Sequence, residues 1–158
     1  YGENSCVISE SYFNSALPAD TSDDVFVTID RDLLSRVCTN IIGNSVKYKR
    51  NDVVHVAVTV EHDAASPLQQ VNITMSDDGP GVPTESLAHL FTVFYRCDGS
   101  RKNTAEGSGL GLAIAAKAVQ KMGGTIRAEN IATGGLSVII TLPQASQPSV
   151  IQHDKDSV

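Results

Sequence analysis

The chain has 158 residues, of which 41% are hydrophobic and 19% are charged, a composition typical of one folded domain with a buried core. The net charge of −6 and the aromatic content of 5% argue against a nucleic-acid partner, because such proteins neutralise phosphates with a basic surface. No segment approaches the roughly 18–20 apolar residues that cross a bilayer, and no signal-peptide pattern is present. The three cysteines include no CxxC pair, which argues against common zinc and dithiol motifs and fits a reducing, cytoplasmic setting.

The first half of the chain predicts a strand, a helix and a hairpin after a polar N-terminal segment. We expect residues 1–24 to be irregular with one edge strand. Asp30 or Asp32 suits the N-cap or first turn of a helix whose apolar residues recur at helical spacing. The predicted elements are a strand over 25–30, a helix over 31–48, and a hairpin of strands over 52–61 and 70–76.

The second half predicts two helices, a long loop and a second hairpin. Thr84 suits the N-cap of a short helix, and Gly123-Gly124 suits the left-handed end of a later one. Residues 97–109 carry few apolar side chains and are expected to form a loop of about a dozen residues, a length that usually indicates either function or disorder. The remaining elements are a helix over 111–122, strands over 125–130 and 136–143, and a polar tail over 144–158.

This order of elements predicts an α/β fold of two layers. Helices that alternate with hairpins, rather than with single strands, favour one mixed and mostly antiparallel sheet of about five strands. We expect three helices to cover one face of that sheet. The folded domain is predicted to span residues 25–143.

The stretch SDDGPGVP, residues 76–83, places two carboxylates before a tight turn. Gly79 and Gly81 permit positive φ and close backbone approach, and Pro80 stiffens the bend. Taken alone, this stretch is better explained as a strand end and tight turn whose acids, Asp77 and Asp78, are only solvated.

The stretch EGSGLGLAI, residues 106–114, places glycines at 107, 109 and 111 before a helix. Backbone N–H groups at a helix start face outward and favour an anion, so a triphosphate suits this loop. A glycine-rich hinge would have a similar sequence. A dinucleotide fingerprint is disfavoured because no strand precedes the glycines, and no GK[ST] follows to make a Walker A loop.

The stretch NIIGNSVKY carries Asn40, Asn44 and Lys47 on one side of the predicted helix. An amide oxygen can coordinate Mg²⁺, and an ammonium can meet phosphate charge. The alternative is a solvated polar edge, although Asn is a poor helix former and some other gain must offset its cost. From this motif alone, both interpretations stay open.

In combination and in this order, these motifs resemble the ATP-binding catalytic domain of bacterial sensor histidine kinases, which has the Bergerat fold. The resemblance covers residues 30–143. The sequence FYRCDGS is similar to the corresponding stretch of kinases that pair with winged-helix response regulators. The N box corresponds to Asn40–Tyr48, the G1 box to Asp77–Gly81, the F box to Phe91–Arg96 and the G2 box to Gly107–Gly111.

The resemblance assigns roles in binding ATP and Mg²⁺. It implies that Asp77 accepts a hydrogen bond from the adenine amino group and that Asn44 ligates Mg²⁺. It also implies that Asn44, Lys47 and Arg96 support phosphoryl transfer. The remaining nucleotide-binding residues that it implies are Asn40, Tyr48, Gly79, Gly81, Phe94, Arg101, Lys102, Gly107, Ser108, Gly109, Leu110 and Gly111.

One departure from related ATPases bears on mechanism. Gyrase B and the Hsp90 chaperones carry a Glu in the N box that activates water, where this chain has Asn40. Asparagine cannot act as a general base, so we expect slow hydrolysis and a γ-phosphate that waits for another acceptor.

The phosphoacceptor histidine is expected to lie outside this chain. HDAASPL, residues 62–68, is similar to the family's acceptor motif, but His62 ends a predicted strand and follows the N box. His55, His89 and His153 are poorer candidates. The resemblance implies an upstream dimerisation domain that carries the acceptor, a cognate response regulator, and a homodimeric parent anchored in the cell membrane. We expect this domain to be cytoplasmic and monomeric on its own.

Other functions of the same fold remain open from the sequence. An ATP-gated interaction module similar to MutL or Hsp90 is disfavoured by Asn40 and by the FYR stretch. A serine kinase similar to anti-sigma factors is disfavoured by the F box. A domain that no longer binds nucleotide is disfavoured because the boxed positions carry suitable residues.

Overall fold

The computed structural model describes residues 5–10, 25–63, 69–97 and 108–145. No helix in these ranges is long and apolar enough to span a bilayer. The helices are α1 (Arg31–Lys47), the 3₁₀ helix η1 (Thr84–His89) and α2 (Gly111–Lys121). The strands are β1 (Ser5–Glu10), β2 (Phe26–Val27), β3 (Val53–Asp63), β4 (Gln70–Asp77), β5 (Thr125–Asn130) and β6 (Leu136–Ala145).

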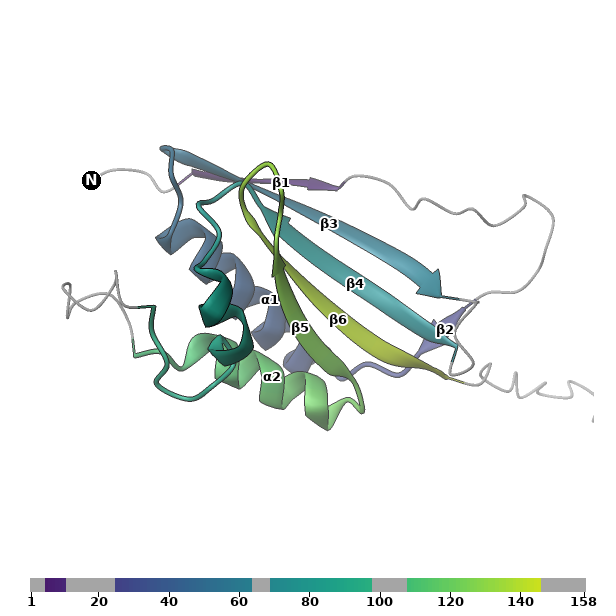
Figure 1. Ribbon diagram of the computed structural model, residues 1–158. Coiled ribbons are helices and arrows are strands. Elements are labelled where there is room, and N and C mark those ends of the chain that lie inside the picture. The colour runs from purple at the N-terminus through teal and green to yellow at the C-terminus, as the bar shows by residue number, and fades with distance from the viewer. Residues whose placement is uncertain (1–4, 11–24, 64–68, 98–107, 146–158) are drawn as a thin grey trace, which may run out of the picture.

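The strands form one mixed sheet with the helices on one of its faces (Figure 1). The sheet order is β1-β3-β4-β6-β2, and β5 also pairs with β6. The β1–β3 pair is parallel, whereas the β3–β4, β4–β6, β5–β6 and β2–β6 pairs are antiparallel. The predicted two-layer α/β fold is therefore confirmed, with β1 as the expected edge strand.

Helix α1 begins where the sequence places its cap. Asp30 accepts hydrogen bonds from the backbone N–H groups of Asp32 and Leu33, at 2.9 and 3.0 Å. One face of the helix is buried through Val37, Ile41 and Ser45. Ser45 is the exception among these three, because it brings a hydroxyl group into the buried layer.

Alternation along the strands decides which side chains face the helices. In β4, Val71, Ile73, Met75 and Asp77 share the helix-covered face, because successive side chains point to opposite sides of a strand. The core consists of Val37, Ile41, Val54, Val56, Met75, Ala115, Ala118, Val119, Val138, Ile140 and Leu142. Asp77 therefore continues the apolar line of β4 and ends it with a carboxylate.

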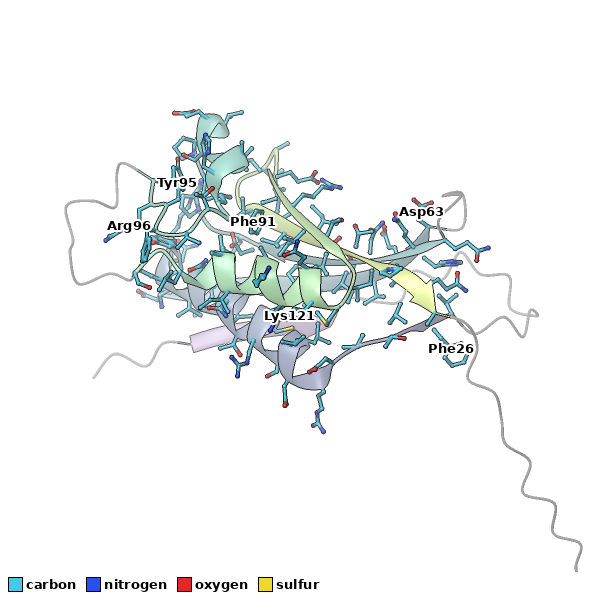
Figure 2. All side chains as sticks on the ribbon, turned by 90° about the horizontal axis from the view of Figure 1, so that it is seen from below. Phe26, Asp63, Phe91, Tyr95, Arg96 and Lys121 are labelled. Carbon is cyan, nitrogen blue, oxygen red and sulfur yellow. The ribbon has the colours of Figure 1, made fainter. Side chains whose placement is uncertain are left out.

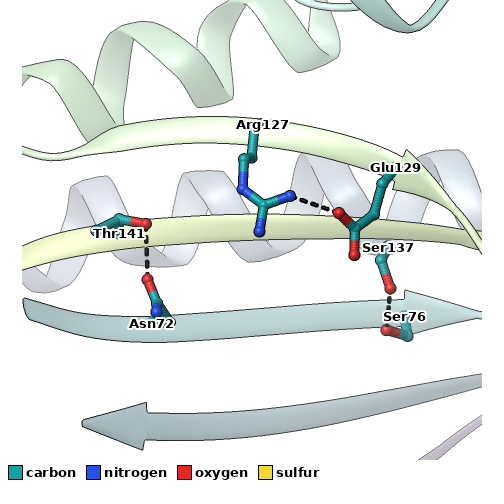
Figure 3. A network of polar contacts seen from close by, with 6 residues as sticks. All are labelled: Asn72, Ser76, Arg127, Glu129, Ser137 and Thr141. Carbon is teal, nitrogen blue, oxygen red and sulfur yellow. Dashed lines mark hydrogen bonds and ion pairs between the residues drawn. The ribbon is translucent and has the colours of Figure 1, made fainter. Parts of the chain in front are cut away.

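The opposite face of the sheet carries polar side chains that bond across strands (Figure 3). Thr141 donates to Asn72 Oδ1 at 2.7 Å, and the hydroxyls of Ser76 and Ser137 lie 2.5 Å apart. Along β5, Arg127 pairs with Glu129. These contacts satisfy polar groups on the face that the helices leave uncovered.

Several predicted boundaries are wrong. The strand predicted over 25–30 is only Phe26–Val27, because Asp30 caps α1 and β2 meets only the last two residues of β6. Thr84 is not an N-cap: η1 begins after Pro83, whose carbonyl accepts from the Ser86 N–H at 2.8 Å. Strand β6 extends to Ala145, two residues into the predicted tail, where that same pairing with β2 holds it.

Helix α2 ends at the predicted glycine pair. Gly123 has φ +76°, and its N–H donates to the Gln120 carbonyl. A Cβ on Gly124 would lie 2.5 Å from the Thr141 carbonyl oxygen, so only glycine fits between α2 and β6.

Candidate functional site

The predicted site residues on α1, the end of β4 and the start of α2 come together at one end of the sheet. Asp77 is the last residue of β4, and α1 passes beside it through Ser45. Figure 2 shows Tyr95 and Arg96 at one end of the molecule, and Asp63 and Phe26 at the other. The fold therefore gathers motifs that lie far apart in the sequence.

Three donors hold the carboxylate of Asp77. Its Oδ1 accepts from the backbone N–H groups of Gly79 and Leu136, both at 3.0 Å. Its Oδ2 accepts from the Ser45 hydroxyl at 2.9 Å. A half-buried carboxylate with three donors is fixed in orientation and presents only acceptor character.

Glycines let the backbone pack around Asp77. A Cβ on Gly79 would lie 3.0 Å from Asp77 Oδ1, and a Cβ on Gly135 would lie 1.9 Å from the Asp77 carbonyl oxygen. Gly81 has φ +69°, as its place in the turn predicts. Gly79 does not have a positive φ, and glycine is needed there because the Asp77 side chain lies close to its backbone.

Asp78 has a different task from its neighbour. Its Oδ1 accepts from the backbone N–H of His55 at 3.0 Å, which ties the turn to β3. The side chain is exposed. Asp77 therefore faces the helices, and Asp78 holds the end of β4 to β3.

Asn40 joins α1 to the glycine-rich start of α2. Its amide nitrogen donates to the Arg36 carbonyl at 2.7 Å. A Cβ on Gly111 would lie 3.0 Å from Asn40 Oδ1. The N box and the G2 box are thus in contact, and Gly111 is the residue that lets them approach.

The start of α2 is suited to an anion. Among the described residues, no side chain caps it, and Leu110 holds the cap position without a polar group. Its first backbone N–H groups have no partner within the helix, because the carbonyls that would accept from them would lie four residues earlier, before the helix begins. This helix start can therefore donate to phosphate oxygens.

Asn44, Lys47 and Tyr48 lie along the last turns of α1. The half-buried side-chain amide of Asn44 makes no hydrogen bond with the described residues. Lys47 donates to the Tyr48 hydroxyl at 3.0 Å, and its ammonium lies 4.7 Å from the Tyr48 ring centroid. Asn44 can thus offer its amide oxygen to a metal ion.

The F box contacts the residues that precede α2. Phe94 and Gly109 have φ +63° and +68°, and the Phe94 N–H donates to the Gly109 carbonyl at 3.0 Å. A Cβ on Gly109 would lie 2.9 Å from the backbone of Phe94. Phe94 as a whole residue is 70% exposed, and the contact with Gly109 is made by its backbone.

The structure describes only some of the remaining residues that were predicted to bind phosphate. Arg96 is half-buried, two residues after Phe94. Ser108 is exposed beside Gly109. Arg101, Lys102 and Gly107 lie outside the described residues.

Two contributors to the site were not predicted from the sequence. Ser45 and the Leu136 N–H both donate to Asp77, from α1 and from the β5–β6 hairpin. Ser45 could have been found as a polar residue on the apolar face of the helix. The Leu136 contact depends on strand register, which the sequence leaves open.

An apolar groove of about 570 Å³ lies elsewhere, between α2, β5 and the segment after η1. Its lining includes Phe91, Val93, Ile114 and Ile126, but neither Asp77 nor Asn44. The groove adjoins the candidate site at Leu110, which also lines it, but it does not include the carboxylate of Asp77 or the amide of Asn44.

The described residues contain no group of three or more His, Cys, Asp or Glu that could hold a metal ion by itself. Mg²⁺ commonly combines few protein ligands with phosphate oxygens and water. The available amide of Asn44 fits that mode of binding.

Comparison with known proteins agrees with this arrangement. Residues 29–146 match the family model described as histidine kinase-, DNA gyrase B-, and HSP90-like ATPase. The sensor histidine kinase WalK of Bacillus subtilis (strain 168) is 38% identical over 120 residues, 76% of this chain and 19% of WalK. The sensor histidine kinase CpxA of Escherichia coli (strain K12) is 37% identical over 110 residues, 70% of this chain and 22% of CpxA.

Among solved structures, the mycobacterial sensor histidine kinase MprB aligns with a TM-score of 0.64 at 28% identity. The alignment covers 78% of this chain and 80% of the MprB chain. The chain thus has the size of that structure, but it spans only about a fifth of the two curated relatives.

Proposed function

The chain belongs to the histidine kinase-, DNA gyrase B- and HSP90-like ATPase family, as an ATP-binding catalytic domain of the sensor histidine kinase type, and we propose that it supplies the γ-phosphate of Mg·ATP to a histidine on an upstream dimerisation domain. The observation that carries the proposal is the position of Asp77. Its acceptor-only carboxylate ends the helix-covered face of β4, beside the helix that meets the uncapped start of α2.

Asp77 would select the base. A carboxylate accepts from the 6-amino group of adenine, whereas the 6-oxo group of guanine would face it acceptor to acceptor. Gly79 leaves room beside the carboxylate and Gly81 shapes the turn. Tyr48, 41% exposed at the end of α1, would pack near the nucleotide.

The phosphates would lie between α1 and α2. Backbone N–H groups from Gly109 to Gly111 would donate to phosphate oxygens, with Lys47 and Arg96 supplying positive charge. Phe94, Gly107, Ser108 and Leu110 would complete this part of the site, and the loop cations Arg101 and Lys102 would reach the β- and γ-phosphates.

Asn44 would ligate Mg²⁺, and Asn40 would support it. The metal ion would bridge and neutralise phosphate oxygens. Asn40 lies against Gly111 at the start of α2, and it cannot remove a proton from water. Position 40 therefore supplies no general base for hydrolysis.

Phosphoryl transfer here would depend on positioning and charge stabilisation. The bond from the γ-phosphorus to the β–γ bridging oxygen would break, and ADP would leave with that electron pair. A nitrogen of the acceptor imidazole would form the new bond to phosphorus. The parent would be a homodimer, anchored in the cell membrane, that passes the phosphoryl group to a response regulator.

Calorimetry of ATP binding tests the proposal. We expect Asp77→Asn to weaken binding of Mg·ATP by about tenfold or more, because one charged hydrogen bond is lost in a site that excludes water. The matched control is Asp78→Asn, which alters the neighbouring acid that bonds only to His55 among the described residues. Unchanged ATP affinity in a folded Asp77→Asn variant would remove Asp77 from the base site.

A further inference from the structure

Ser45 is a buried hydroxyl for which the proposed function has no role. Resting on that function, we propose that Ser45 is a specificity-determining residue that shares Oδ2 of Asp77 with the 6-substituent of the bound purine. Ser45 and Asp77 would together recognise the 6-substituent of the purine. Three observations carry this inference.

The first observation is that Oδ1 of Asp77 is already saturated. It accepts from the Gly79 and Leu136 N–H groups, both at 3.0 Å. A carboxylate oxygen has two lone pairs, so Oδ1 has none left for a ligand. Both donors belong to the backbone, and a side-chain substitution does not remove them.

The second observation is that Oδ2 has one acceptor site left. The Ser45 hydroxyl occupies the other, at 2.9 Å. A purine amino group can therefore bond only to Oδ2, the oxygen that Ser45 holds. In a site closed by a base, Ser45 would be the remaining protein donor to that oxygen among the described residues.

The third observation is that the Ser45 proton has a second acceptor. The Ile41 carbonyl, one turn back along α1, lies 3.2 Å from Oγ. The hydroxyl can turn toward that carbonyl, and its lone pairs then face Asp77. Ser45 can thus either donate to residue 77 or accept from it.

These observations predict the orientation of an asparagine at position 77. The two backbone N–H groups would require the amide oxygen at the Oδ1 position, which puts the amide nitrogen at the Oδ2 position. Ser45 would then donate to Ile41 and accept from this nitrogen. The second N–H of the amide would face the base as a donor, which suits a 6-oxo purine.

The experiment compares ADP with inosine diphosphate, which has a 6-oxo group in place of the 6-amino group. Calorimetry would measure both with wild type, Ser45→Ala, Asp77→Asn and the double variant. We expect wild type to prefer ADP and Asp77→Asn to prefer inosine diphosphate. For Ser45→Ala, we expect ADP affinity to fall by about tenfold, because a charged oxygen loses a donor in the bound state.

The double variant tests whether Ser45 acts through the charge on residue 77. With asparagine at position 77, Ser45→Ala should lower ADP affinity by only about two- to threefold. The loss is smaller because a neutral amide that loses one hydrogen-bond partner costs less free energy than a charged carboxylate that does so. An equal loss in both backgrounds would overturn the inference.

Ser137→Ala is the matched control, since Ser137 is also buried but bonds to Ser76 on the opposite face of the sheet. It should leave the preference for ADP unchanged. Thermal unfolding would check that each variant is folded. Wild-type ADP affinity retained in Ser45→Ala, or a persisting ADP preference in Asp77→Asn, would overturn the inference. Absence of ADP binding by wild type would instead overturn the proposed function.

Discussion

At the scale of single residues, the site depends on the face of the strand from which each side chain projects. Asp77 and Asp78 are adjacent and chemically alike, yet one faces α1 and the other bonds to β3. The alternation of Val71, Ile73 and Met75 determines which acid faces the helix. Asp77 is two residues after Met75 and therefore points to the same face of the sheet, whereas Asp78 does not. The sequence therefore contains the information that separates the two acids.

Asn44→Ala should remove most of the Mg²⁺ dependence of ATP binding. The half-buried amide has no hydrogen bond to the described residues, so its loss leaves no protein group unpaired. We expect the ratio of ATP affinities with and without Mg²⁺ to fall by about tenfold, the size of one lost charge-assisted contact. Calorimetry in Mg²⁺ and in EDTA measures this ratio.

Asn72→Ala is a suitable control for that experiment. Asn72 lies on the opposite face of the sheet, where it bonds to Thr141. A Mg²⁺ dependence that survives Asn44→Ala intact would show that the metal ligand is another residue.

At the scale of elements, helix and strand positions were predictable where local signals agree. The apolar spacing and the Asp30 cap place α1 within one residue, and Gly123 ends α2 as predicted. The two-residue β2 was not predictable in length, because its extent depends on pairing with the end of β6. The hydrogen bonds from Ser45 and Leu136 to Asp77 also depend on tertiary packing, so the sequence indicates the acid but not its partners.

Gly43 gives a prediction for α1. It lies inside the helix, is exposed, and a Cβ there would meet no atom within 4 Å. Gly43→Ala should therefore raise the free energy of unfolding by about 1 kcal/mol, because alanine loses less backbone entropy in a helix. Urea denaturation of the nucleotide-free domain measures the change.

The control for Gly43 is a glycine that packing requires. Gly124→Ala should lower the free energy of unfolding by about 1–3 kcal/mol, because its Cβ would overlap the Thr141 carbonyl and Leu142. A destabilised Gly43→Ala variant would indicate that α1 contacts something that the described residues do not include.

At the scale of the whole molecule, the fold separates the proposed nucleotide site from His62, whose motif resembles that of an acceptor. His62 lies in β3 opposite Val71, and its Nε2 is 3.2 Å from Gln144 Oε1. Asp77 lies six residues further along β4, about 20 Å away at the usual rise of a strand. His62 is thus held at the far end of the sheet.

The chain alone should therefore not phosphorylate itself. After incubation with Mg²⁺ and ATP labelled at the γ-phosphate, we expect no acid-labile label on the protein and only slow release of phosphate. His62→Ala should behave like wild type. Acid-labile label that disappears in His62→Ala would show that the acceptor lies within this chain.

The most direct test of the proposed site is a crystal structure of the domain with Mg·ADP. We predict that the adenine amino group lies within hydrogen-bonding distance of Asp77 Oδ2, with the phosphates at the start of α2 and Mg²⁺ at Asn44. A base bound away from Asp77, or phosphates bound away from α2, would contradict the proposed site.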